Sequence, residues 1–105
     1  FLDLSAEGLH PDGAVTAEDG TLWIAQWGAG RVAAYTAAGA FLRAVPVPAR
    51  NPTCPAFGGI DFRDLHVTSA TQGLSAAELQ DGGKHGQTFV LHDLAQGRAE
   101  PRVIL

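Results

Sequence analysis

Residues 18–39 read EDGTLWIAQWGAGRVAAYTAAG, and this stretch decides the fold class. Glu18-Asp19-Gly20 is a turn signal, because glycine accepts a positive φ without steric cost. The run from Thr21 to Trp27 is rich in β-branched and aromatic residues and predicts a strand. Gly28-Ala29-Gly30 turns the chain, and Arg31 to Tyr35 returns it as a second strand. The stretch therefore predicts a β-hairpin.

Strands are also predicted on both sides of this hairpin. Ala14 to Ala17 precedes it, and Ala40 to Val47 follows it. Pro46 and Pro48 place the last of these strands at an edge of the sheet or end it there, because proline cannot donate to a ladder. Four short antiparallel strands in succession predict a meander over residues 1–50.

The second half of the chain repeats this arrangement over residues 51–105. Pro55 to Ile60 takes the place of the first strand, and Leu65 to Thr68 matches Leu22 to Ala25 at an offset of 43 residues. Gln87 to Leu91 is the predicted third strand, and Pro101 to Leu105 the closing one. Because propeller blades recur at about 40–50 residues, the sequence predicts an all-β fold of about two four-stranded antiparallel propeller blades. A small sandwich or barrel is the alternative.

An insertion separates the second and third strands of the repeated unit. It spans residues 71–85 and contains one predicted helical turn, from Ser75 to Leu79, with Ser75 as N-cap and Glu78 three positions later. Such a loop lies on one rim of a propeller, where it can cover the mouth of the channel or contact a partner. A solvated loop without a role is an equal alternative.

Composition excludes several classes of protein. Apolar residues make up 46% of the chain and charged residues 17%, which excludes a disordered tail. The formal net charge is −4 and the basic residues are scattered, which argues against nucleic acid or an anionic membrane as partner. The lone Cys54 fits a reducing compartment, and we take a cytoplasmic location as the default. With no Met in the sequence, we expect a piece of a longer protein.

A colinear series of short motifs covers residues 10–92. It consists of His10-Pro11-Asp12-Gly13, Asp19 to Ala25, Gly28 to Val32, Val47-Pro48, Asn51-Pro52-Thr53, Phe57-Gly58-Gly59, Asp64 to Thr68 and Gly86 to Phe89. In order and spacing these motifs resemble the SMP-30/gluconolactonase/luciferin-regenerating-enzyme family, which includes regucalcin. The resemblance covers most of this chain and about the last third of a family member.

The resemblance implies a six-bladed β-propeller with a divalent cation in its central channel, and often the hydrolysis of sugar lactones. The family's metal is held by an N-terminal Glu, by Asn residues in the middle of the chain, and by the Asp of a Pro-Asp-Gly motif, which is Asp12 here. We therefore expect the C-terminal fragment of a metal-dependent sugar lactonase that uses Ca²⁺, Zn²⁺, Mn²⁺ or Mg²⁺. The alternative is a non-catalytic calcium-binding or scaffold segment.

The chemistry of Asp12 agrees with this role. Carboxylate oxygens suit hard cations, and a bound divalent ion polarises a carbonyl and acidifies water. Asp12 is thus the predicted metal ligand and the predicted catalytic base, although Pro-Asp-Gly is also a common plain turn. As an isolated piece the chain should be inactive, and it should self-associate through uncovered blade faces.

The other candidate residues are interpreted as structural. Trp23 and Trp27 lie at even spacing in one strand, so they point to one face and are expected to pack between blades rather than stack on sugar. Cys54 has no histidine partner in sequence that would favour a thiol nucleophile. The histidines lack the spacing of metal ligands and are interpreted as loop, packing or surface residues: His10, His66, His85 and His92.

Overall fold

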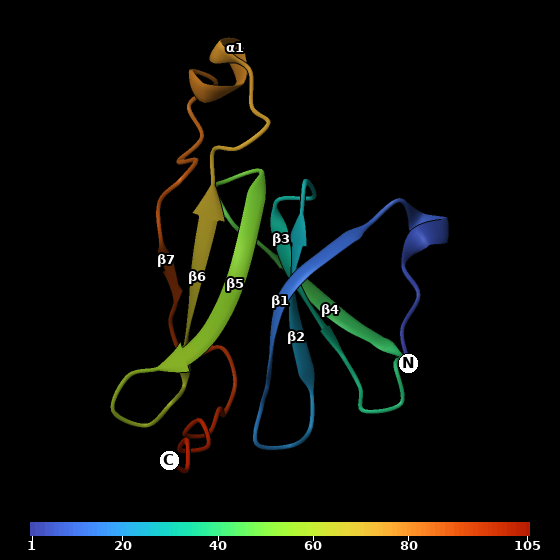
Figure 1. Ribbon diagram of the computed structural model, residues 1–105, viewed down its shortest axis with the longest axis vertical. Coiled ribbons are helices and arrows are strands. Elements are labelled where there is room, and N and C mark those ends of the chain that lie inside the picture. Colours follow the sequence, from blue (N-terminus) through green and yellow to red (C-terminus); the bar gives the residue numbers. More distant parts are fainter.

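A computed structural model describes residues 1–105 and shows two antiparallel sheets (Figure 1). The first sheet has the order β1 (His10–Thr16), β2 (Leu22–Trp27), β3 (Arg31–Tyr35) and β4 (Phe41–Pro46). The second has the order β5 (Asn51–Gly58), β6 (Asp64–Ala70) and β7 (Phe89–Leu91). The helical segments are η1 (Ser5–Glu7) and α1 (Ala76–Leu79), and neither has the length and apolar character needed to span a membrane. The predicted all-β class is confirmed.

The hairpin predicted from residues 18–39 forms the centre of the first sheet. β2 and β3 pair from Leu22↔Tyr35 to Gln26↔Arg31 without a register shift. Gly28 and Gly30 occupy the turn with φ of 84° and 63°, a region that residues with a Cβ rarely adopt. β4 lies at the sheet edge, as its terminal Pro46 predicts.

The main core lies between the two sheets. Alternate residues of β2 and β3, Trp23 with Val32 and Ala34, face Leu65 and Val67 of β6. All five are essentially buried, and Trp23 is only 2% exposed. β5, the first strand of the second sheet, contacts both β1 and β2 of the first sheet and closes this core on that side. The prediction that Trp23 packs between two sheets is confirmed.

The opposite face of the first sheet carries a second, smaller cluster. Ile24 and Tyr35 pack there against Leu4 of the N-terminal segment. Gln26 donates from Nε2 to the Tyr35 hydroxyl at 2.8 Å and accepts from Arg31 Nε at 2.6 Å. Since Gln26 and Tyr35 are buried, these hydrogen bonds satisfy polar atoms that water does not reach.

The second sheet has three strands, whereas four were predicted. Residues 101–105 form no strand, and β7 therefore has only one paired edge. After β7 the chain does not continue as a strand. Leu94 N donates to Arg63 O and Gly97 N donates to Phe62 O, and these hydrogen bonds hold the segment after β7 against the β5–β6 connection. Backbone hydrogen bonds between distant segments thus override a strand-like local sequence.

Strand bounds also differ from the prediction in the second sheet. β5 begins at Asn51, before the predicted start at Pro55, and β7 is limited to Phe89–Leu91. Prolines at positions 52 and 55 are tolerated because β5 pairs with β6 alone and its other edge needs no donor. The predicted helical turn is confirmed, since Ser75 Oγ accepts from Glu78 N at 3.1 Å and caps α1.

Candidate functional site

Asp12 lies within β1 and not, as predicted, just before the strand. Pro11 pairs with Gln26 and Ala14 pairs with Ile24, so Asp12 and Gly13 together stand opposite one residue of β2. Such a bulge bends a strand and redirects the side chain at the bulge. The Asp12 side chain is exposed, and it makes no hydrogen bond or ion pair within the chain.

Gly13 brings this bulge against the second sheet. A Cβ at Gly13 would lie 2.7 Å from Thr53 O and 2.9 Å from Cys54 Cα, both backbone atoms of β5. No side chain fits in that space, so the β1–β5 contact requires glycine. β5 has its own register shift between Pro52 and Cys54, beside the bulge of β1. The first strands of both sheets are therefore irregular where they touch.

Thr53 and Cys54, the β5 residues at this contact, interact with Thr68 of β6. The hydroxyls of Thr53 and Thr68 are 2.7 Å apart, and Thr68 Oγ1 also donates to Cys54 O at 3.3 Å. The Cys54 thiol is exposed, and its nearest polar contact is Pro55 O at 3.7 Å. With no base beside it, Cys54 lacks the environment of a nucleophile, in line with the sequence-based interpretation.

This chain can supply one ligand of a cation site. Asp12 offers a carboxylate free of internal partners, which is the group that a hard divalent ion prefers. The chain contains no group of three His, Cys, Asp or Glu residues able to hold a metal ion. A cation bound through Asp12 would therefore need further ligands from outside these 105 residues.

The histidines take separate structural positions. His10 is exposed opposite Trp27, and the ring of His66 covers Gly58. The ring of His92 is 79% exposed and lies 3.5 Å from Asp64. His85, by contrast, has a side chain only 5% exposed and takes part in a network that the sequence did not reveal.

That network fastens the β6–β7 connection, residues 71–88, to the segment that joins the sheets. His85 Nδ1 accepts from Arg50 N at 3.2 Å, and the Arg50 guanidinium pairs with Glu78 at 2.6 Å. Lys84 N donates to Pro48 O, and Asn51 Nδ2 donates to Gln72 O. No local sequence signal could identify these partners, because each contact joins residues at least 21 positions apart.

Two aspartates are kept ionised by hydrogen bonds in the second half. The backbone N–H of Gly83 and the ring of His85 hold the pKa of Asp81 below its usual value of 3.8. The backbone N–H of Asp93 lowers the pKa of Asp64 in the same way. Asp81 is bound within its own loop, whereas Asp64 of β6 is bound to the segment after β7, so both carboxylates act as anchors of structure.

Comparison with known proteins identifies the relatives of this chain. The family model "SMP-30/Gluconolactonase/LRE-like region" matches residues 1–71. L-arabinolactonase of Azospirillum brasilense is 41% identical over 102 residues, covering 97% of this chain and 33% of the relative. The 6-deoxy-6-sulfogluconolactonase of Pseudomonas putida is 40% identical over 94 residues, covering 90% of this chain and 32% of the relative.

A solved structure matches the whole chain. The calcium-binding protein regucalcin from Agrobacterium tumefaciens superimposes with a TM-score of 0.95 at 37% identity, covering 100% of this chain and 36% of that protein. The chain thus spans about a third of the length of these relatives. Motifs, sheets and alignments agree, and the chain belongs to the SMP-30/gluconolactonase/LRE-like family.

Proposed function

We propose that this chain is the C-terminal portion of a divalent-metal-dependent sugar lactonase, in which Asp12 binds the cation. Its two sheets, within residues 1–50 and 51–105, would be consecutive blades of a six-bladed propeller. The relatives named as lactonases support hydrolysis of a sugar lactone to the aldonic acid. The identity of the cation, Ca²⁺, Zn²⁺, Mn²⁺ or Mg²⁺, is left to experiment.

The exposed, unpaired carboxylate of Asp12 in a strand bulge carries this proposal. The contact of β5 with Gly13 fixes the backbone of the bulge. The backbone of Asp12 would therefore lose little conformational freedom when its carboxylate binds the cation. A plain surface turn would have no need of this close contact between two sheets. The arrangement therefore favours a ligand over a solvated turn.

The chemistry of lactone hydrolysis fits such a group. A bound divalent cation would supply Lewis acidity toward the lactone carbonyl and acidify a water molecule. One oxygen of Asp12 would hold the cation, and the other would accept the proton of the attacking water. Attack forms the new C–O bond, the ring C–O bond breaks, and the ring oxygen leaves as a hydroxyl after protonation.

A non-catalytic calcium-binding segment is the second candidate. It is favoured by the solved relative, which is described as a calcium-binding protein. This candidate also uses Asp12 as ligand but predicts no turnover. An activity assay distinguishes the two proposals, because only the lactonase predicts turnover, whereas both predict cation binding.

The test is lactone hydrolysis by the full-length protein after removal of metal and reconstitution with each cation in turn. We expect activity to return with at least one cation, and Asp12→Ala and Asp12→Asn to lose at least about a hundredfold in kcat/KM. Asp61→Asn, which changes an exposed aspartate whose side chain makes no hydrogen bond, is the matched control and should stay active. Full activity without metal, or in Asp12→Asn, would contradict the proposal.

A further inference from the structure

The first strand of the second sheet repeats the bulge of β1. Pro52 pairs with Ser69, and Cys54 pairs with the next residue of β6, Thr68. Thr53 is therefore the extra residue of β5, with no partner of its own across the ladder. A bulge redirects the side chains that it contains, so the side chain of Thr53 does not follow the plain alternation of the strand.

Thr53 holds in the second sheet the place that Asp12 holds in the first. The proline before Asp12 pairs with Gln26, and the proline before Thr53 pairs with Ser69. Gln26 and Ser69 are separated by 43 positions, the offset at which the second half of the chain repeats the first. The backbone arrangement that presents Asp12 therefore recurs at Thr53.

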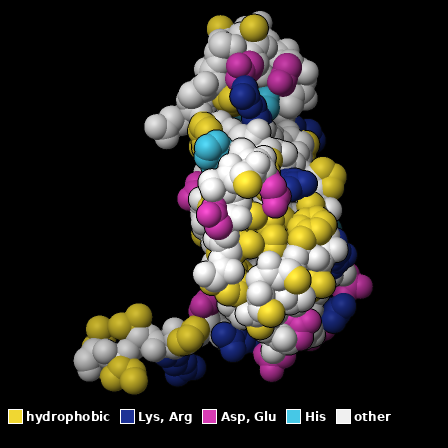
Figure 2. All heavy atoms as spheres, turned by 90° about the vertical axis from the view of Figure 1, so that its right-hand side faces the viewer, with side chains coloured by type: hydrophobic (Ala, Val, Ile, Leu, Met, Phe, Trp, Pro, Cys, Tyr) yellow, Lys and Arg dark blue, Asp and Glu magenta, His cyan; other side chains and the backbone are white.

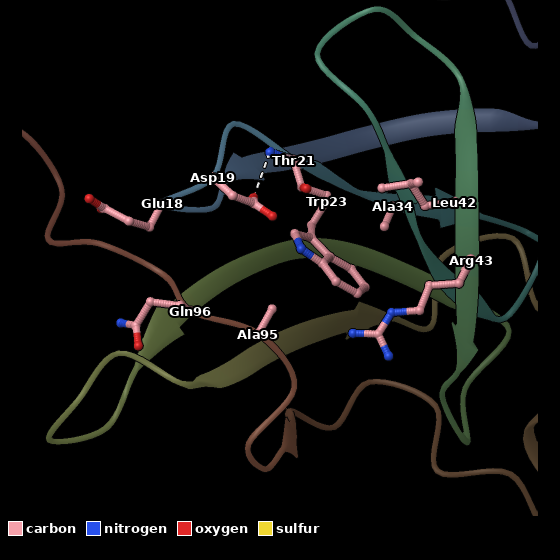
Figure 3. Close-up of a pocket in the computed structure, with 9 residues that line it drawn as sticks. All are labelled: Glu18, Asp19, Thr21, Trp23, Ala34, Leu42, Arg43, Ala95 and Gln96. Atoms are coloured by element: carbon pink, nitrogen blue, oxygen red, sulfur yellow. Dashed lines mark hydrogen bonds between the residues drawn. The ribbon is translucent and has the colours of Figure 1, made fainter.

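The two bulges also lie against each other. The Cβ that Gly13 lacks would stand 2.7 Å from Thr53 O, so Thr53 lies at the same end of the sheets as Asp12. The cavity of about 400 Å³ between the sheets lies at the other end of β1, beside Glu18 and Asp19, and Asp12 does not line it (Figure 3). A molecule bound at Asp12 is therefore a neighbour of Thr53 and not of this cavity.

Hydrogen bonds within the second sheet leave the Thr53 hydroxyl able to accept. The Thr68 hydroxyl donates to Cys54 O at 3.3 Å, and a hydroxyl has only one proton to donate. The hydrogen bond of 2.7 Å between the two threonine hydroxyls is therefore donated by Thr53. Thr53 Oγ1 thus has no proton left for a ligand, but it keeps a lone pair that can accept from one.

Packing of a further sheet is compatible with access to Thr53. Asp12 stays exposed although β5 lies directly against its bulge at Gly13. A sheet that packs in the same way on the second sheet would meet β5 at Cys54, which follows Thr53 as Gly13 follows Asp12. Such a sheet would leave Thr53, which is half-buried in this chain, at the edge of the contact.

We propose that Thr53 is a specificity-determining residue of the lactonase site, where it accepts a hydrogen bond from a hydroxyl group of the sugar lactone. The inference rests on the proposed function, because Thr53 meets the lactone only if Asp12 holds the cation in the central channel. A sugar lactone carries several hydroxyl groups, whereas an unsubstituted lactone carries none. An acceptor beside the cation therefore selects for a polyhydroxy ring.

The test measures the binding of two lactams, which have the shape of lactones and are not turned over by a lactonase. D-gluconolactam carries the hydroxyl groups, and δ-valerolactam is the same ring without them. Both are titrated calorimetrically into the cation-loaded full-length protein. Thr53→Val keeps the shape of the side chain and removes the acceptor. We expect it to bind D-gluconolactam about three- to tenfold more weakly and δ-valerolactam as wild type does.

Two further variants separate this contact from damage to the fold. Thr53→Ser keeps the hydroxyl and should bind D-gluconolactam within about twofold of wild type. Thr88→Val, at an exposed threonine of the β6–β7 connection, is the matched control and should bind both lactams normally. Equilibrium dialysis should give Thr53→Val the cation affinity of wild type, because a bulge disturbed by the substitution would change cation binding as well.

The outcomes keep the two proposals apart. Absence of turnover in wild type, combined with weaker D-gluconolactam binding in Thr53→Val, would remove the lactonase and support Thr53 as a contact of a bound sugar ring. Cation-dependent turnover combined with wild-type D-gluconolactam binding in Thr53→Val would overturn the inference alone. An equal loss of both lactams in Thr53→Val, or no saturable binding of D-gluconolactam by wild type, would overturn it too.

Discussion

Residue 13 decides how Asp12 is presented. Glycine is required at position 13 because a side chain there would overlap β5. Its backbone conformation does not require glycine, since its φ is not in the left-handed region. The sequence could identify Asp12 from the Pro-Asp-Gly motif, but it could not reveal the close contact with Thr53 and Cys54. That contact joins residues 40 positions apart, and only the packing of two sheets creates it.

We predict that Gly13→Ala destabilises the full-length protein by about 1–3 kcal/mol, because the new Cβ would overlap backbone atoms of β5 that cannot rotate away. Chemical denaturation measures the change, and activity should fall with it as the bulge moves. Gly28→Ala is the control for backbone strain alone, since its Cβ would meet nothing within 4 Å although its φ is 84°. Equal activity in Gly13→Ala and wild type would show that the spacing at β5 does not position Asp12.

At the scale of elements, local patterns predicted hairpins and missed long-range connections. Turn chemistry at Gly28 and Gly30 and the composition of β2 and β3 depend on neighbours in sequence, so this hairpin could be predicted, whereas β1 begins at His10 and not at the predicted Ala14. Neighbours in sequence could not show whether the fourth strand expected at residues 101–105 forms. Its absence follows from the hydrogen bonds of Leu94 and Gly97 to the β5–β6 connection.

We predict that His85→Ala loosens the β6–β7 connection without unfolding the sheets. Removing the Nδ1 acceptor frees Arg50 N, so hydrogen exchange at this amide should accelerate about fivefold. His92→Ala is the matched control, because that ring is 79% exposed and contacts a different loop. Unchanged exchange at Arg50 in His85→Ala would show that the backbone bond from Lys84 to Pro48 is sufficient to hold the segment.

Asp81 makes the stability of the same connection depend on pH. Because Gly83 N and His85 lower its pKa below 3.8, its contribution is fully present above pH 3.8 and is lost as the pH falls through the lower folded-state value. Asp81→Asn lacks this contribution at every pH. The denaturation midpoints of wild type and variant should therefore differ at neutral pH and converge below 3.8. A constant difference over the whole range would exclude a role for the charge.

For the whole molecule, exposed apolar surface is the dominant feature. Phe41 and Leu42 at the edge strand β4 are 56% and 51% exposed, and Val103, Ile104 and Leu105 are almost fully exposed. Figure 2 shows hydrophobic side chains gathered on one face and on a segment that projects from the body. Surfaces of this kind are covered when repeat units stack on neighbours.

We therefore predict that residues 1–105 expressed alone self-associate, whereas the full-length protein does not do so through these surfaces. Sedimentation velocity over a range of concentrations measures the outcome. A single monomeric boundary at all concentrations would mean that the exposed apolar residues need no covering sheet.

Direct measurement of cation binding tests the proposed role of Asp12 as a ligand without reliance on turnover. Equilibrium dialysis of the metal-free full-length protein should show one cation bound per chain in wild type and in Asp61→Asn. In Asp12→Asn, which keeps the shape of the side chain and removes its charge, affinity should fall at least about a hundredfold. Wild-type affinity in Asp12→Asn would contradict the account.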